Sequence, residues 1–150
     1  MLNRDTQASK QRLRMWIQLL RVTRGMENHL RGYLRVHHDT TLPRFDVMAA
    51  LYRRPDGMMM SELSRMLLVS NGNATTVVDR LIQDGLVTRK VPESDRRSVY
   101  VALTPKGLQK FEALAMDHER EIAQRFSEIS DEDTEVLIAI LKRSGRNGKS

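Results

Sequence analysis

The segment Ser61–Lys106, SELSRMLLVSNGNATTVVDRLIQDGLVTRKVPESDRRSVYVALTPK, determines how the rest of the chain is interpreted. Its apolar residues recur at three- and four-residue spacing as far as Ile82, which predicts two short helices. Ser61 suits the N-cap of the first helix, and Gly72 supplies the backbone freedom that a tight turn between the helices needs. Gly85 suits the end of the second helix. The first half of the segment therefore predicts a helix, a turn and a second helix.

The second half of the segment has the alternating, β-branched pattern of two strands. Residues 86–91 and 98–103 carry this pattern, and the charged link 92–97 between them predicts a hairpin. The order of helix, turn, helix and hairpin is that of a winged helix-turn-helix, a module that places one helix in the major groove of DNA. The predicted fold class is mainly α with a small antiparallel β wing.

Composition and charge limit the classes of protein that the chain can belong to. Its 150 residues suit one domain, and a net charge of +6 suits a polyanionic partner. The basic excess lies near the beginning, where residues 1–60 hold 11 Lys and Arg against 5 Asp and Glu. The absence of cysteine excludes disulfides and thiolate metal sites. No apolar run resembles a membrane span or a signal peptide, so we expect a cytoplasmic protein with no membrane partner.

Long amphipathic helices are predicted on both sides of the central segment. Apolar residues recur at helical spacing over about 7–36, and again from Thr104-Pro105, a hydroxyl cap followed by a proline that suits a helix start. Ser130 begins a further helix, with Asp133 in the third position of a capping pattern. A first helix this long has more apolar surface than a small domain needs, so we expect part of it to meet another subunit.

Sequence readout requires side chains that reach base edges from the first turns of the second helix in the segment. The candidate residues are Asn71, Asn73, Thr75, Thr76 and Arg80. Asparagine can pair with adenine, threonine can offer its methyl group to thymine, and arginine can bind guanine or a phosphate. This small polar face predicts contact with bases.

Taken together, these stretches resemble the MarR family (multiple antibiotic resistance regulators). The matching stretches are LPRFDVMAALYRRPDG, MSELSRMLLVSNGNATTVVDRLIQDGLVTRK, the wing SDRRSVYVALTPKG and the helical C-terminus. The resemblance implies one domain, with dimerisation helices at about 7–36 and 105–144 around a winged helix-turn-helix at about 43–104. It also implies a homodimeric repressor that binds a palindromic operator.

The wing is the second predicted DNA contact. Arg96 and Arg97 lie at the tip of the hairpin beside Asp95, which suits insertion of one arginine into the minor groove. The family pattern implies that Asp95 orients an arginine, and the sequence leaves open which of the two enters the groove. Arg89 and Lys90 are predicted phosphate neighbours.

The resemblance also implies a small-molecule pocket between the dimer region and the DNA-binding lobe. The NGN element and TTLPRFDV are similar to members that control aromatic-acid catabolism, some of which respond to coenzyme A thioesters. The predicted effector is therefore a small aromatic acid or its CoA thioester. Aromatic and Met side chains at helical spacing also suit a packed core. The candidate lining residues are Trp16, Tyr33, Phe45, Met48 and Tyr52, with Arg12, Arg21 and Arg24 for an anionic group.

Three alternatives compete with a ligand-responsive repressor. An enzyme is disfavoured because the histidines are scattered and no glycine-rich phosphate loop is present. A metal-responsive regulator of the same fold would use His38, Asp39 and His118, without help from cysteine. A winged-helix protein that coats DNA or acts as an adaptor would keep the fold without sequence preference. We expect no catalytic site, no cofactor and no metal site.

Overall fold

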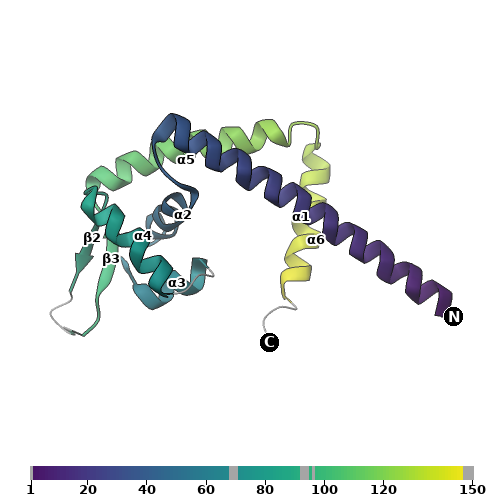
Figure 1. Ribbon diagram of the computed structural model, residues 1–150, viewed down its shortest axis with the longest axis horizontal. Coiled ribbons are helices and arrows are strands. Elements are labelled where there is room, and N and C mark those ends of the chain that lie inside the picture. Colours follow the sequence, from purple (N-terminus) through teal and green to yellow (C-terminus); the bar gives the residue numbers. More distant parts are fainter. Residues whose placement is uncertain (1, 68–70, 92–94, 96, 147–150) are drawn as a thin grey trace. The chain divides into compact units, whose positions relative to one another are not determined.

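A computed structural model describes residues 2–67, 71–91, 95 and 97–146, apart from the side chains of 2–4, 71–72 and 146. The chain divides into two compact units, residues 1–118 and 119–150. The elements, labelled in Figure 1 except for β1, are α1 (Leu2–His38), α2 (Leu42–Tyr52), β1 (Met58–Met59), α3 (Met60–Leu67), α4 (Asn71–Gln83), β2 (Val87–Lys90), β3 (Tyr100–Leu103), α5 (Pro105–Arg125) and α6 (Asp131–Arg146). The fold is mainly α with a small antiparallel sheet, as the sequence predicts.

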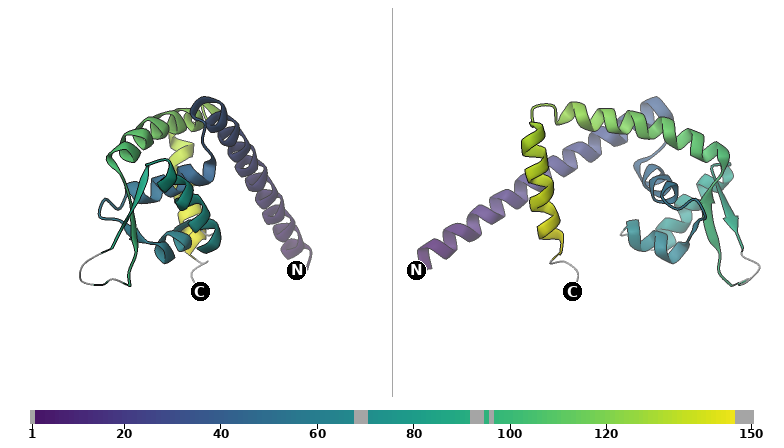
Figure 2. Two further views of the ribbon diagram at one scale, coloured as in Figure 1. Left: turned by 60° about the vertical axis from the view of Figure 1, so that its left-hand side comes forward. Right: turned by 180° about the vertical axis from the view of Figure 1, so that it is seen from behind.

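The sheet has the strand order β1-β3-β2, and both strand pairs are antiparallel. Val87 lies opposite Leu103 and Arg89 opposite Val101, so β2 and β3 form the predicted hairpin. The two strands extend side by side, away from the helices that precede them (Figures 1 and 2). The short strand β1 pairs with the other edge of β3, which gives the wing a third strand at its base.

A single hydrophobic core joins the helices of the first unit to this sheet. Its fully buried side chains come from α1, α2, β1, α3, α4, β2, β3 and α5. They include Leu34, Met48, Leu51, Met58, Leu63, Leu81, Val87, Val101 and Leu114. Burial of each such side chain contributes roughly 1.5–3 kcal/mol before opposing terms. The core therefore holds α4 and the wing on one packed unit.

Three helices begin where hydroxyl side chains can accept their first free N–H groups. The Oγ1 of Thr41 accepts from the N–H of Arg44 at 3.3 Å, ahead of the proline in the first turn of α2. The Oγ1 of Thr104 accepts from Gly107 at 3.0 Å, and the Oγ of Ser130 accepts from the N–H of residue 133 at 3.1 Å. The predicted starts of α5 and α6 are confirmed.

The end of α4 is fixed by Gly85, whose φ of +75° lies in the region that favours glycine. The N–H of Leu86 donates to the carbonyl of Leu81 at 2.9 Å, and the N–H of Gly85 donates to Ile82 at 3.0 Å. This pair of bonds is the Schellman arrangement with Gly85 at C′, which the sequence predicts.

The start of α5 packs directly against that helix end. The hydroxyl of Thr104 donates to the carbonyl of Gly85 at 2.7 Å. Gly107 approaches the backbone of Leu86 so closely that an added Cβ would overlap the Leu86 carbonyl oxygen. The Thr-Pro-Lys-Gly motif thus joins α5 to the end of α4.

Two features differ from the sequence prediction. Ser61 lies inside α3, which begins at Met60, because β1 leads directly into the helix without a separate cap residue. α1 runs from Leu2 to His38, further in both directions than the predicted 7–36. No helix in the described part of the chain is both long and apolar enough to cross a membrane.

Candidate nucleic-acid interface

α4 presents a polar face to solvent and an apolar face to the core. Ala74, Val78 and Leu81 are at most 1% exposed, which fixes the orientation of the helix. Asn71 opens the helix, although its side chain lies outside the described part. The exposed side chains are Asn73, Thr75, Thr76, Asp79, Arg80 and Gln83. The exposed set includes four of the five predicted base-contacting residues, Asn73, Thr75, Thr76 and Arg80.

The exposed face of α4 carries both polar and charged groups. Arg80 extends Nε to within 3.5 Å of the Asp84 carboxylate, one turn further along the helix. The threonines and Asn73 lie nearer the beginning of α4, where a helix enters a groove. The uncharged N-terminal part of this face suits base edges, and Arg80 suits a base or a phosphate.

The tip of the wing is organised by Asp95. Its carboxylate accepts from the Ser98 hydroxyl at 2.7 Å and from the backbone N–H of Arg97 at 3.0 Å. These two bonds, that of the Ser98 hydroxyl first, lower the pKa of the Asp95 carboxyl below its ordinary 3.8. The contact with Arg97 is to its backbone, so Asp95 positions the turn, and the Arg97 side chain is exposed. The predicted contact Arg96 lies outside the described residues.

The strand that leads into the wing carries the predicted phosphate neighbours. Lys90 is exposed at the end of β2. Arg89 directs its guanidinium Nη2 to the Asp79 carboxylate of α4, at 2.6 Å. Nearby, the Nζ of Lys106 donates to the Asp84 carbonyl at 3.1 Å. Arg89 therefore pairs with a side chain on the exposed face of α4, and Lys106 donates to a backbone carbonyl just after the end of α4.

The residues predicted to line an effector pocket range from buried to exposed. Phe45 and Met48 are buried in the core, where the Phe45 ring stacks on His118 at 4.3 Å. Tyr33 is half-buried and its ring lies 4.3 Å from that of His37. The exposed members of the set are Arg12, Trp16, Arg21, Arg24 and Tyr52. Phe45 and Tyr52 both lie against Phe111, with ring centroids 5.5 and 4.9 Å away, whereas Trp16 and the three arginines are exposed on α1.

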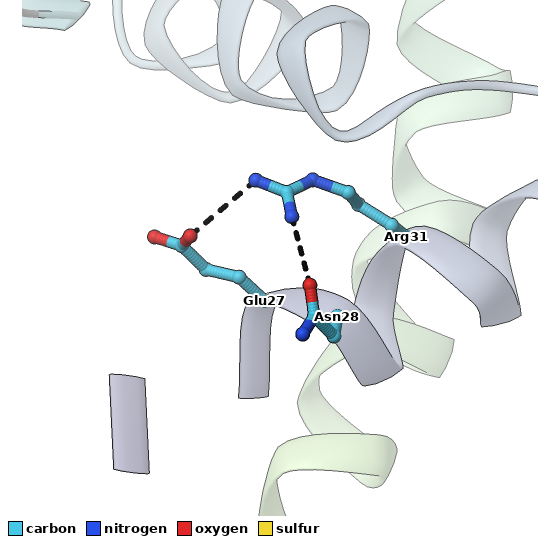
Figure 3. Close-up of polar contacts among 3 residues, drawn as sticks. All are labelled: Glu27, Asn28 and Arg31. Carbon is cyan, nitrogen blue, oxygen red and sulfur yellow. Dashed lines mark hydrogen bonds and ion pairs between the residues drawn. The ribbon is translucent and has the colours of Figure 1, made fainter. Parts of the chain in front are cut away.

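A cavity of about 380 Å³ lies instead between α1 and the start of α2. It is lined by Asn28, Arg31, Gly32, Arg35, Thr40, Thr41, Leu42 and Pro43. Figure 3 shows that the Arg31 guanidinium is held by the Glu27 carboxylate at 3.4 Å and the Asn28 amide oxygen at 3.0 Å. Arg35 follows one turn later and has no ion-pair partner among the described residues. The two guanidinium groups suit an oxyanion.

Sequence reasoning missed Arg31 and Arg35 because arginines on a long helix usually belong to a solvated face. The available signal was their spacing of four residues, which places both on the helix face that carries Asn28 and Gly32. The polar link Thr40-Thr41 closes the same cavity, and Thr40 is only 7% exposed. All of the lining residues fall within 28–43, but the conformation of the link between α1 and α2 has no local sequence pattern that predicts a cavity.

The proposed metal ligands do not meet. His38 pairs with Asp117, with 2.7 Å between Nε2 and Oδ2. His118 instead stacks on Phe45, where burial lowers the pKa of its imidazole. Across the described ranges, no three His, Asp or Glu side chains are placed to share a metal ion.

Comparisons with known proteins place the chain among regulators. The family model described as MarR family matches residues 40–99. The curated protein "HTH-type transcriptional regulator MhqR" of Bacillus subtilis is 31% identical over 137 residues, which cover 91% of this chain and 93% of that protein.

Solved structures agree over most of the chain. A MarR family transcriptional regulator from Silicibacter pomeroyi is 33% identical with a TM-score of 0.78, covering 94% of this chain and 97% of that one. AbsC, a MarR family transcriptional regulator from Streptomyces coelicolor, is 26% identical with a TM-score of 0.79, covering 89% and 90%.

Proposed function

The chain belongs to the MarR family and is a transcriptional regulator rather than an enzyme. From this premise we propose that it is a homodimeric repressor that binds a palindromic operator. The observation that carries the proposal is the exposed polar face of α4 beside a wing whose tip is braced by Asp95. One element suits a major groove and the other a neighbouring minor groove.

In this proposal α4 supplies base contacts and the wing supplies minor-groove and phosphate contacts. Asn73, Thr75, Thr76 and Arg80 read the operator together with Asn71, and Arg97 or Arg96 enters the minor groove. Lys90 contacts the backbone. Because phosphate contacts are independent of sequence, the wing strengthens binding while α4 selects the site.

The dimer is proposed from apolar surface that the chain leaves exposed. On α6, Leu137, Ile140 and Leu141 are 40–49% exposed, and on α1 Leu13 and Trp16 are 54–56% exposed. Contiguous apolar faces of this kind are characteristic of protein–protein contacts. Two copies of α4 held about one helical turn of DNA apart (~34 Å) would meet successive major grooves.

Release from the operator is proposed to follow binding of a small organic acid, an aromatic acid or its CoA thioester, in the α1–α2 cavity. A volume of about 380 Å³ suits a small aromatic acid, and the coenzyme part of a thioester would extend beyond it. Arg35 and Arg31 would bind the anionic group. α2 contacts both α1 and α4, so a displaced α2 would move the recognition helix. A coupling of ~1–3 kcal/mol would weaken operator binding roughly 5–150-fold.

The test measures binding to a promoter fragment from the chain's own locus, with and without an aromatic acid and its CoA thioester. Salt-dependent, palindrome-specific binding that a ligand weakens supports the repressor. Specific binding that ignores both ligands leaves the regulator and contradicts the effector. Binding without sequence preference contradicts both and supports the coating or adaptor alternative.

Two matched variants locate the effector. Arg35→Gln removes the cavity arginine that has no partner in the described structure, and Arg24→Gln removes an exposed arginine of the same helix. We expect Arg35→Gln alone to lose the response to ligand while operator affinity is kept. Loss in Arg24→Gln instead would favour the site predicted from the sequence.

A further inference from the structure

The ion pair between Arg89 and Asp79 joins the two elements that are proposed to bind DNA. Arg89 lies on β2, opposite Val101 in the ladder, and Asp79 lies on the outward face of α4. The Nη2 to Oδ1 distance of 2.6 Å is short for a bond between charged groups. Both side chains are about half exposed, at 55% and 50%. The pair is therefore a surface contact whose value for stability alone is small.

The position of Asp79 gives the pair a second consequence. Asp79 lies one helical turn after Thr75 and Thr76, so its carboxylate is on the face of α4 that is proposed to meet DNA. An unpaired carboxylate there would repel phosphates. Arg89 neutralises it, and the ion pair in turn offsets the charge of Arg89.

The neighbouring pair on α4 has a different geometry. Arg80 and Asp84 are joined at 3.5 Å and both belong to the same helix, one turn apart. That pair cannot fix one element against another. Asp79 and Arg89, ten residues apart, connect the recognition helix to the strand that carries the wing. Their bond adds a direct link between the two proposed DNA contacts to the core packing that already holds both elements on one unit.

Resting on the proposed operator binding, we propose that Asp79 is a specificity-determining residue that acts by holding Arg89. Phosphate contacts supply essentially all of non-specific affinity, because every sequence offers the same backbone. Withholding one mobile cation from phosphates weakens binding to all sequences. Fixing the wing against α4 favours the one site where both sets of contacts fit. Together these effects raise the ratio of specific to non-specific affinity.

The rival interpretation is the one the sequence predicts, in which Arg89 contacts a phosphate directly. The two differ in the variant Asp79→Asn and most clearly in the double variant that adds Arg89→Gln. Under our proposal Asp79→Asn frees Arg89 for phosphates. Under the rival interpretation, Arg89 already contacts a phosphate in the wild type, so Asp79→Asn adds no phosphate contact.

The experiment compares the full-length wild type with Asp79→Asn, Arg89→Gln and the double variant by fluorescence polarisation. Each protein is titrated with an operator duplex and a scrambled duplex over a series of salt concentrations. We expect Asp79→Asn to bind scrambled DNA more tightly, with a salt slope steeper by about one contact (~0.9) and a gain of up to ~8-fold at 0.1 M salt. Its preference for the operator should fall.

The double variant decides between the interpretations. Under our proposal, the double variant should have the wild-type salt slope. The two changes remove one negative and one positive charge, so the uncharged pair has the same net charge as the ion pair that it replaces. The operator preference of the double variant should stay low, because the ion pair that links α4 to β2 is absent. Arg89→Gln should weaken binding to both duplexes. Glu112→Gln, which removes an exposed carboxylate from α5, controls for net charge, and thermal unfolding of each variant checks the fold.

Two outcomes would contradict different claims. Unchanged scrambled-duplex binding in Asp79→Asn, with a slope reduced by about one in the double variant, would overturn the inference and assign Arg89 to a phosphate. A wild-type protein with no operator preference would overturn the proposed function itself.

Discussion

At the scale of single residues, Gly107 shows how closely α5 packs against the end of α4. A Cβ added by Gly107→Ala would overlap the carbonyl oxygen of Leu86, which is backbone and cannot rotate away. We expect a loss of about 1–3 kcal/mol in the free energy of unfolding, because the two segments must separate. Denaturant or thermal unfolding measures this loss.

Gly32→Ala is the matched control, because an added Cβ there meets nothing within 4 Å and the residue lies inside α1. Alanine is favoured over glycine in a helix by up to about 1 kcal/mol, so this variant should be unchanged or more stable. Equal losses in both variants would contradict the packing argument.

His118 is a second single residue with a testable effect, because its protonation makes the free energy of unfolding depend on pH. Burial lowers the pKa of this imidazole below its ordinary 6.5, so on acidification the unfolded chain takes up the proton before the folded protein does. The free energy of unfolding should therefore fall as the pH drops below about 6.5. In His118→Gln this part of the loss should be absent in unfolding curves at pH 7 and pH 5.5.

The pKa of Asp46 affects the free energy of unfolding in the opposite direction to that of His118. Burial first, and the nearby Glu27 second, raise the pKa of its carboxyl above 3.8. The folded protein thus takes up this proton more readily than the unfolded chain, so this group's contribution to the free energy of unfolding rises as the pH falls. A His118→Gln variant that loses as much stability as the wild type between pH 7 and pH 5.5 would contradict the His118 prediction.

At the scale of elements, the wing offers a test that separates charge from geometry. Arg97→Ala should weaken binding to every duplex and lower the salt slope by about one, if its side chain contacts phosphate or the minor groove. Asp95→Ala removes the bonds to the Arg97 N–H and the Ser98 hydroxyl but removes no cation. It should weaken operator binding with no decrease in slope.

Ser98→Ala removes only one of the two bonds to Asp95, so its loss of operator affinity should lie between the wild type and Asp95→Ala. Binding isotherms at several salt concentrations measure all three variants. A reduced salt slope in Asp95→Ala, equal to that of Arg97→Ala, would mean that the turn geometry has no separate role.

The elements themselves could be predicted because their signals are local. The caps at Thr104 and Ser130 and the glycine end of α4 each depend on residues a few positions apart. The outward face of α4 followed from the spacing of its apolar residues. The Asp79–Arg89 pair and the α1–α2 cavity could not be predicted, because they depend on side chains brought together by packing.

At the scale of the whole molecule, the exposed apolar residues of α6 predict that the protein is a dimer. Val136, Leu137, Ile138, Ile140 and Leu141 are each 40–56% exposed, which leaves apolar groups on more than one side of the helix. Leu137→Asp would place a charge in the proposed interface, where burial of an unpaired charge is costly. We expect this variant to be monomeric in sedimentation and light-scattering measurements at concentrations where the wild type is a dimer.

Operator binding should follow the change in assembly, because a monomer carries one α4 and can engage one half-site at a time. Leu137→Asp should therefore lose far more affinity for a full palindrome than for a single half-site. Lys142→Glu changes the charge of an exposed residue on the same helix and should leave both the mass and the binding unchanged. A Leu137→Asp protein that remains dimeric would remove α6 from the interface. A monomer that still prefers the palindrome over the half-site would contradict the proposed use of two recognition helices.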